Sequence, residues 1–343
     1  MLVANAAHGG FRIVDAFSRI VRLGEGVAAT GALSEAAMDR TVDALKVCAQ
    51  KMMKRGATRR RCIATQACRS AGNGAAFLAR VRDETGIDFE IITPEEEARL
   101  AVAGCADLVD PQADAAIVFD IGGGSTEISF LARRETDARG GGGAALDLVA
   151  WLSIPFGVVT LSEKYGGAAL SRDAYAAVIS DMKEEIRRLD PPADVAAVFQ
   201  DGRGHLLGTS GTVTSLAGVH LGLPKYRRDL IDGLWLTAVD ARSVSERLRA
   251  MSLEGRAGEP CIGGDRADLV VCGCAIFEAI LDLWPCERIR VADRGLREGV
   301  LAGLIEEDRR RAAKRRRAKT RARRRAAKRK EAGEPDRDKN GDA

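Results

Sequence analysis

The stretch that most restricts the fold of this chain is AAIVFDIGGGSTEISFL, at residues 115–131. A run of apolar residues ends at Asp120, three glycines follow, and a second, alternating run begins at Glu127. Short apolar runs bounded by glycine indicate two strands joined by a tight turn. Helix-length segments alternate with such strands along the chain, which is typical of an α/β architecture.

The 343 residues are enough for about two domains that each bury a core. We place a boundary near Asp110-Pro111, which predicts domains at 1–112 and 113–308 and a tail at 309–343. Apolar spacing and turn residues predict helices over 34–56, 73–85, 94–109, 171–189, 236–250, 266–283 and 295–305, strands over 11–23, 62–67, 89–93, 146–161 and 289–293, and a strand with a glycine turn over 205–212.

The net charge of +4 is unevenly distributed along the chain. Residues 309–330 hold 15 of the 53 basic residues and no acid, so the rest of the chain has 38 basic against 49 acidic residues, a net charge of −11. The Ala, Arg and Lys of this segment favour a helix, whereas its closely spaced like charges oppose one. We expect a disordered tail whose residues 309–330 contact polyanions. We do not expect these residues to recognise a nucleotide sequence, because they include no aromatic side chain to stack on bases.

Composition excludes several kinds of site. Three histidines are too few for a multi-histidine metal phosphohydrolase, and the eight cysteines include no C-x-x-C pair, so neither a zinc ribbon nor a redox dithiol is present. Most of these cysteines lie in apolar runs, where a free thiol behaves as a small hydrophobe and indicates a reducing compartment. The chain starts with neither a basic segment nor a long apolar one, and its most apolar later segment carries two acids. We expect a cytoplasmic protein that does not contact a membrane.

The glycine turn is the first candidate site. Gly122, Gly123 and Gly124, followed by Ser125 and Thr126, direct N–H groups and hydroxyls to one point, which suits phosphate oxygens. Asp120 and Glu127, at facing ends of the hairpin, could share a divalent cation whose coordination waters complete. The alternative is an ordinary hairpin with two solvated acids. Neither the P-loop pattern nor a G-x-G-x-x-G before a helix is present in this stretch.

The second candidate is TPEEEAR at residues 93–99. Thr93 as N-cap, Pro94 at the first helical position and Glu96 three residues after the cap form a capping box, and the helix dipole favours Glu95. Glu97 has no part in this capping arrangement. Three consecutive carboxylates repel one another, which raises the proton affinity of at least one of them and suits a general base. Glu97 is therefore either a catalytic base or a plain surface acid.

Three weaker signals remain. Gly208, Ser210, Gly211 and Thr212 belong to a glycine turn between a strand and a helix, which is either a second anion site or a plain turn. Arg69 and Arg297 could hold phosphates, and each could equally be an ordinary salt-bridging arginine.

Together these motifs resemble the exopolyphosphatase and guanosine pentaphosphate phosphohydrolase (Ppx/GppA) family of the actin-like ATPase superfamily. The resemblance runs from Gly10 to Ile305 and rests on five segments: GFRIVDAFSRIVRLGEG (10–26), EEEARL (95–100), DIGGGSTE (120–127), GTSGT (208–212) and DRGLREG (293–299). It implies two actin-like (ribonuclease H-like) α/β domains with an interdomain cleft. The chain is similar to the short, two-domain form of the family, for which a homodimer would be expected.

The resemblance also implies roles for residues of this chain. Glu97 matches the glutamate that activates the attacking water, and Asp120 and Glu127 match the acids that bind Mg²⁺ (or Mn²⁺). The loops at 122–126 and 208–212, together with Arg69, match phosphate-holding groups. The implied reaction is hydrolysis of a terminal phosphoanhydride of polyphosphate or of guanosine pentaphosphate. The implied binding partners are polyphosphate and guanosine penta- or tetraphosphate.

The sequence departs from the family pattern at its start. Family members open with a strand and a D-x-G-[ST]-N loop just before the segment that resembles Leu2-Val3-Ala4, and this loop is absent from the 343 residues. Loss of one preorganised donor lowers a rate by about 10²–10³-fold, so activity of the chain would suffer. We hypothesise that the start codon was placed too far downstream. Three other functions stay open: a catalytically weak regulator that binds the alarmone or polyphosphate, a kinase of the same superfamily, and a nucleic-acid-associated protein.

Overall fold

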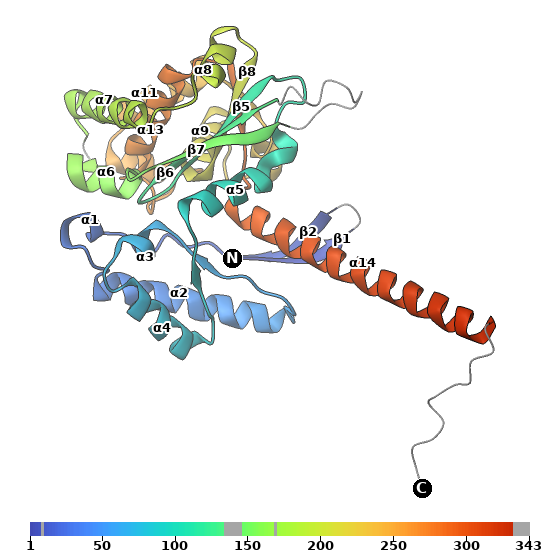
Figure 1. The fold of residues 1–343 in the computed structure, drawn as a ribbon. Helices are drawn as coiled ribbons and strands as arrows, with labels where there is room; N and C mark the ends of the chain where they lie inside the picture. Colours follow the sequence, from blue (N-terminus) through green and yellow to red (C-terminus); the bar gives the residue numbers. More distant parts are fainter. Residues whose placement is uncertain (8–9, 134–145, 168–169, 332–343) are drawn as a thin grey trace.

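The computed structural model describes residues 1–7, 10–133, 146–167 and 170–331. The chain forms a smaller first part (residues 1–108) and a larger second part (residues 115–295), followed by one long helix (Figure 1). The first part comprises β1 (Leu2–Ala7), β2 (Gly10–Ala16), α1 (Val27–Thr30), α2 (Glu35–Lys54), β3 (Ile63–Ala64), α3 (Gln66–Ser70), α4 (Gly74–Thr85), β4 (Glu90–Ile91), α5 (Pro94–Cys105) and the 3₁₀ turn η1 (Ala106–Leu108).

The strands of the first part form two separate sheets. β1 pairs antiparallel with β2, and β3 pairs in parallel with β4. α2 begins where the sequence predicts, because the Ser34 side chain accepts a hydrogen bond from the Ala37 N–H. α2 and α4 pack through Met38, Val42 and Phe77, which are buried. The first part therefore rests on a small helical core beside two short sheets.

The second part is built on a six-stranded sheet in the order β7-β6-β5-β8-β10-β9. Its elements are β5 (Ala115–Ile121), β6 (Thr126–Ala132), β7 (Asp147–Ile154), α6 (Val158–Tyr165), α7 (Arg172–Arg188), α8 (Ala193–Gln200), β8 (Gly204–Thr209), α9 (Ser210–His220), α10 (Arg228–Ile231), β9 (Trp235–Thr237), α11 (Ala238–Ala250), α12 (Leu253–Gly258), α13 (Val270–Leu283) and β10 (Arg288–Val291). β8 lies parallel to both β5 and β10, and the other strand pairs are antiparallel.

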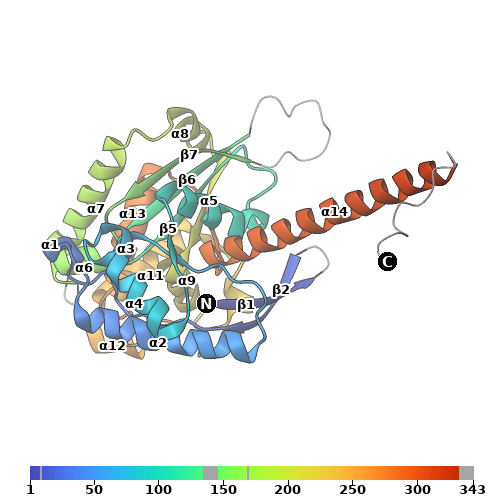
Figure 2. The same cartoon turned by 60° about the horizontal axis from the view of Figure 1, so that its bottom comes forward.

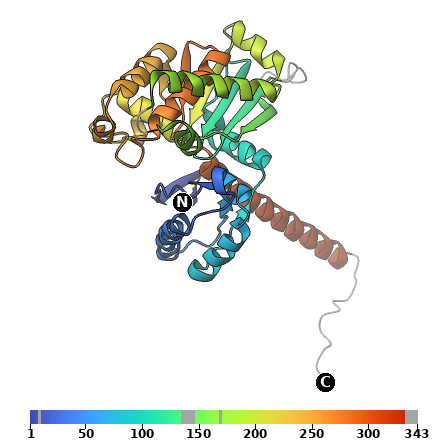
Figure 3. The ribbon, with the colours of Figure 1, turned by 90° about the vertical axis from the view of Figure 1, so that its left-hand side faces the viewer.

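β5 is covered on both faces, as its continuous apolar run predicts. Ile117 and Phe119 face a large core that includes side chains of α7, α9 and α13, whereas Ala116 and Val118 face a smaller cluster that includes Cys105 at the end of α5. The sheet is thus held between helices on each side (Figures 1 and 3). This burial fixes the end of β5, where the glycine turn begins.

The strand predicted over 146–161 is correct only as far as Ile154. α6 starts at Val158, and its first N–H groups donate to the glycine turn, from Val158 to the Gly122 carbonyl and from Val159 to the Gly123 carbonyl (both 2.9 Å). A Cβ on Gly157 would lie 2.4 Å from the Gly123 carbonyl carbon. Only a glycine allows the chain to come this close, so the sequence folds back over the turn instead of extending as a strand.

The last helix, α14 (Leu296–Glu331), crosses α5 at two glycines. A Cβ on Gly299 would lie 1.9 Å from the Leu100 oxygen, and a Cβ on Gly104 would lie 1.9 Å from the Gly295 oxygen. α14 then leaves the body as a single rod (Figure 2). Disorder was expected from residue 309, but residues 309–331 are helical without a break at 309, because packed residues of the same helix nucleate them. Residues 332–343 of the expected tail lie outside the described residues.

Among the helices formed by the described residues, none combines the length and the apolar character needed to cross a membrane.

Candidate active site

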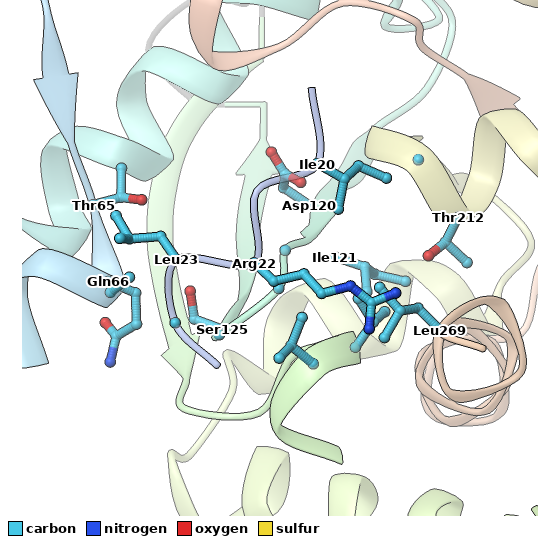
Figure 4. A pocket seen from close by; sticks show the side chains of 18 of the residues that line it. Ile20, Arg22, Leu23, Thr65, Gln66, Asp120, Ile121, Ser125, Thr212 and Leu269 are labelled. Carbon is cyan, nitrogen blue, oxygen red and sulfur yellow. The ribbon is translucent and has the colours of Figure 1, made fainter. Parts of the chain in front are cut away.

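A cavity of about 400 Å³ lies between the first and second parts of the molecule. The first part lines it with residues 20, 22–24, 65–67 and 97, and the second part with residues 120–125, 127, 158–159, 211–212, 215, 266 and 269–270. Figure 4 shows Asp120 and Ser125 of the second part around the same space as Arg22 and Gln66 of the first. Its volume falls within the range of small-molecule sites.

The glycine turn forms one wall of the cavity. Gly122, Gly123, Gly124 and Ser125 all line it, and the Gly122 N–H donates to the Ser125 carbonyl (2.9 Å), which closes the turn. Thr126, which was predicted to hold phosphate, does not line the cavity. Its side chain is fully buried, and its hydroxyl donates to the Phe156 carbonyl (2.7 Å), so it anchors the turn instead.

Asp120 and Glu127 are directly opposite each other in the antiparallel ladder of β5 and β6. Directly opposed residues put their side chains on the same face of a sheet, with Cβ atoms about 4.5–5.5 Å apart. Both side chains line the cavity, and Glu127 also accepts a hydrogen bond from the Ser153 hydroxyl (3.2 Å). The hairpin therefore brings the two acids together, as the sequence predicted.

Glu97 lies on α5, in the opposite wall. The Glu96 N–H donates to the Thr93 hydroxyl (3.2 Å), which confirms the predicted N-cap. Glu95 pairs with Arg99 (2.9 Å) and Glu96 pairs with Arg61 at the surface. Of the three consecutive glutamates, only Glu97 lines the cavity.

Arg69 stands behind Glu97 and is not itself part of the cavity wall. Its guanidinium donates to the Ile92 carbonyl and to the Gln66 side-chain oxygen (both 2.7 Å) and lies 3.3 Å from the Glu97 carboxylate. In this structure the Arg69 donors are directed to protein acceptors, and its expected contact with phosphate stays a prediction. Arg69 orients Glu97 and Gln66, which do line the cavity.

Three acids of the cavity have raised pKa values. Burial raises the pKa of Glu97, against the opposing effect of Arg69, and burial also raises the pKa of Asp120. For Glu127, burial first and then the charges of Glu97 and Asp120 raise the pKa to about 8. Besides burial, the charge of Asp120 raises the pKa of Glu97, and the charges of both raise the pKa of Glu127, so a cation would stabilise this group of acids.

The residues present fit a divalent cation in one limited sense. Asp120 and Glu127 offer carboxylate oxygens on one face of the hairpin, and Mg²⁺ is commonly held by one or two carboxylates together with waters and substrate phosphates. Within the described ranges, no group of three or more His, Cys, Asp or Glu side chains is arranged to hold a metal. Phosphate and water oxygens would have to supply the remaining ligands.

The second glycine turn contributes less than predicted. Gly211 and Thr212 line the cavity at the start of α9. Gly208 and Ser210 do not. A Cβ on Gly208 would lie 2.6 Å from the Phe119 ring, and Ser210, at a φ of 77°, donates its hydroxyl to the Ile121 carbonyl (3.0 Å). Both residues hold β8 against β5.

Arg297 is exposed in the first turn of α14 and does not line the cavity. Its charge opposes the rise in the pKa of Asp120, and it adds to the effect of burial in lowering the pKa of the Met1 amino group. The structure therefore does not bring Arg297 to the phosphate-binding wall where it was expected.

A model of the Ppx/GppA phosphatase family matches residues 2–308. The chain belongs to the Ppx/GppA phosphatase family. It is 29% identical over 311 residues to a guanosine-5'-triphosphate,3'-diphosphate pyrophosphatase of Photobacterium profundum, with 90% of this chain and 57% of that protein covered. It is 30% identical over 305 residues to the protein of the same name from Aeromonas hydrophila, with 89% and 57% covered. The chain thus spans somewhat more than half the length of these relatives.

Solved structures of the Ppx/GppA family share this fold. The Aquifex aeolicus family member superposes with a TM-score of 0.71 at 27% identity, covering 90% of this chain and 94% of that one. An exopolyphosphatase of Cytophaga hutchinsonii superposes with a TM-score of 0.77 at 23% identity, covering 89% and 94%, which is a likeness of fold. The predicted α/β fold of the Ppx/GppA family is confirmed.

Sequence reasoning missed two arginines of this Ppx/GppA cavity. Arg22 lines it and forms two 2.8 Å hydrogen bonds to Asp268 of the second part. Arg266 lines it beside Gly211, with its guanidinium carbon 3.3 Å from where a Cβ on that glycine would lie. Arg22 lies in the 10–26 segment that carries the family resemblance, but no role was assigned to it, and Arg266 lies in none of the five segments. The only signal was a basic residue close to glycines, in RLGEG and in GGDR.

Proposed function

We propose that this chain hydrolyses terminal phosphoanhydride bonds of guanosine pentaphosphate, of inorganic polyphosphate, or of both. One observation carries the proposal: Glu97 of the first part lines the same cavity as the glycine turn with its two acids in the second part. Membership of a phosphatase family and the names of the Photobacterium and Aeromonas relatives support it. The name of the Cytophaga structure is the reason to keep polyphosphate beside the nucleotide.

In the proposed mechanism Glu97 orients a water and accepts its proton as the oxygen attacks the terminal phosphorus in line with the leaving oxygen. The raised pKa of Glu97 suits it to receive this proton, and Arg69 fixes the direction of its carboxylate. Backbone N–H groups of the glycine turn hold phosphate oxygens. Mg²⁺ or Mn²⁺ held by Asp120 and Glu127 would neutralise the charge of the phosphate oxygens.

The test is phosphate release from guanosine pentaphosphate and from long-chain polyphosphate, with and without Mg²⁺. We expect Glu97→Gln to lower kcat by at least about 10²-fold, the usual size of a general-base contribution. Glu95→Gln is the matched control, because Glu95 lies on the same helix turn but pairs with Arg99 at the surface. If Glu97→Gln and Glu95→Gln leave equal activity, Glu97 is not the base. Binding of either substrate without phosphate release would indicate a regulator instead.

We further propose a reducing, cytoplasmic compartment, supported by the finding that all eight cysteines are free thiols. The homodimer expected from the family resemblance stays a prediction.

A further inference from the structure

The part of α14 that extends beyond the body has no role in the proposed hydrolysis. We call residues 309–330 the basic rod; 15 of its 22 residues are Lys or Arg. At its base, Arg59 of the first part pairs with Glu307 (2.8 Å) and with Asp308. From residue 309 to residue 321, where side chains are described, every position is exposed. The rod is thus anchored at one end, and its side chains are open to solvent as far as Arg321 (Figure 2).

The cations of the rod face every direction. Nine of the 13 residues at 309–321 are basic, and at 3.6 residues per turn they leave no quarter of the helix circumference without a positive charge. With a rise of 1.5 Å per residue, the rod is about 33 Å long and carries one charge per ~2 Å. A protein-binding helix would instead present one apolar or complementary face.

This arrangement is unfavourable for the isolated helix. Arg311 and Arg315, and likewise Arg317 and Arg321, lie four residues apart, where like charges destabilise a helix. Acids at its base relieve part of the repulsion, since Arg310 pairs with Glu306 (2.9 Å). A ligand that places negative charge on several sides of the rod at once would relieve the rest.

We propose that the basic rod binds duplex DNA non-specifically, lying in its major groove. B-DNA carries one negative charge per ~1.7 Å, close to the spacing of the rod's cations. Its major groove is about 12 Å wide, which accepts a helix of ~10–12 Å, and phosphates line both walls. The rod has the length of about one duplex turn. It has no aromatic residue, so it cannot stack on the bases of a single strand.

Two features favour DNA over a polyphosphate chain on its way to the cavity. α14 runs outward from α5 on the side opposite α6, whose Val158 and Val159 line the cavity (Figures 1 and 2). A single linear polyanion would also meet only one side of the rod, whereas the cations occupy all sides. The net charge of −11 on the rest of the chain repels a large polyanion and confines its contacts to the rod.

The test uses the full chain and a fluorescent 24-base-pair duplex of arbitrary sequence, with binding followed by polarisation at several salt concentrations. The rod variant is K314Q/R315Q/R316Q/R317Q. The matched control, R82Q/R188Q/R203Q/R227Q, removes the same charge from exposed positions of the body. We expect the rod variant to bind at least about tenfold more weakly and to reduce the slope of log K against log[salt] by up to ~4, while the control stays within about threefold.

Several outcomes would overturn the proposal. These are no binding by the unaltered chain, an equal loss in both variants, or tighter binding to a single strand of the same length. Long-chain polyphosphate that displaces the duplex at a tenfold lower phosphate concentration would instead make polyphosphate the partner. Phosphate release by the rod variant, measured in parallel, separates this inference from the proposed hydrolysis, because no residue of the rod lines the cavity.

Discussion

The two parts of the molecule that meet at the cavity are built very differently. Among the described residues, the main core of the second part gathers 40 buried apolar side chains around a six-stranded sheet. The core between α2 and α4 in the first part gathers eight, beside two sheets of two strands each. The second part holds the glycine turn and two acids on buried strands, whereas the first part presents Glu97 from the end of a helix.

This difference in core size suggests different roles for the two parts in the proposed reaction. The glycine turn of the second part would have to keep its backbone N–H groups directed at phosphate. A large core holds them in place, because moving a strand would expose buried apolar surface to water. The wall with the proposed base depends on fewer contacts, which come mainly from the crossing of α5 with α14 and from Arg69. We therefore expect the first part to open locally at a lower free energy than the second.

The most demanding test removes one aromatic ring from each core. Phe130→Ala should lower the free energy of unfolding by about 3–5 kcal/mol, because Phe130 is fully buried and its ring centroid lies 5.4 Å from that of Trp284. Phe77→Ala should instead speed hydrogen exchange in α2 and α4 and leave the amides of β5 and β6 protected. Exchange measured by mass spectrometry decides this. Equal acceleration in both parts would mean that they unfold as one unit.

The second test concerns the charge of Glu127 in the cavity wall formed by the second part. Because burial raises the pKa of Glu127 to about 8, from 4.5, folding favours its protonated form. Without divalent cations, its contribution to stability is complete below pH 4.5 and is lost as the pH rises toward 8, by at most ~1.4 kcal/mol per pH unit. Thermal unfolding of Glu127→Gln should show a weaker decline with pH than the unaltered chain. A decline of the same size in both would assign it to another group.

A third test displaces the helix that carries Glu97. Gly299→Ala should cost about 1–3 kcal/mol, because the new Cβ would meet the Leu100 oxygen at 1.9 Å. Gly303→Ala, one turn later in α14, has no atom within 4 Å of its Cβ and should stabilise the helix by roughly 0.5–1 kcal/mol. Denaturant titration gives both values, and phosphate release should fall only for Gly299→Ala. Equal stabilities would show that α5 and α14 adjust freely.

The smallest effect is expected at one of the contacts that span the two parts. Arg22 bonds Asp268 through two 2.8 Å hydrogen bonds, but both side chains remain partly exposed. A double-mutant cycle with Arg22→Gln and Asp268→Asn should give a coupling energy of about 0.2–1 kcal/mol in thermal unfolding. A coupling of several kcal/mol would mean that this pair, rather than the helix crossing, holds the parts together.

The features predicted well from the sequence are local ones. The cap at Thr93, the pairing of Asp120 with Glu127 and the start of α2 at Ser34 all depend on residues within a few positions of each other. Local hydrogen bonds and glycine geometry decide such features before the chain meets distant partners. Glu97 was singled out because the cap at the start of its helix gave it no part, and it is the glutamate of the three that lines the cavity.

Where a residue predicted to hold phosphate does not line the cavity, a distant contact decides its position. Thr126 turns to the Phe156 carbonyl, and Arg69 is occupied by Ile92 and Gln66. Gly208 gives space to Phe119. Each of these residue types suits a phosphate contact, but in the structure the residue contacts a protein acceptor or packs against a ring. Composition cannot reveal this, because it does not say which side of a strand or turn a neighbour occupies.

The sequence by itself indicated most of the helices and strands of this protein and the hairpin of its glycine turn, because hydrophobic period, capping and backbone freedom act over a few residues. Only the tertiary structure decided which side chains share the cavity. Arg22 and Asp268 are 246 positions apart and meet only when the two parts pack together. It also decided that α14 continues as a helix into the basic rod. The start of α14 packs against α5 and so provides a helical nucleus, whose formation would be unfavourable in the highly charged segment alone.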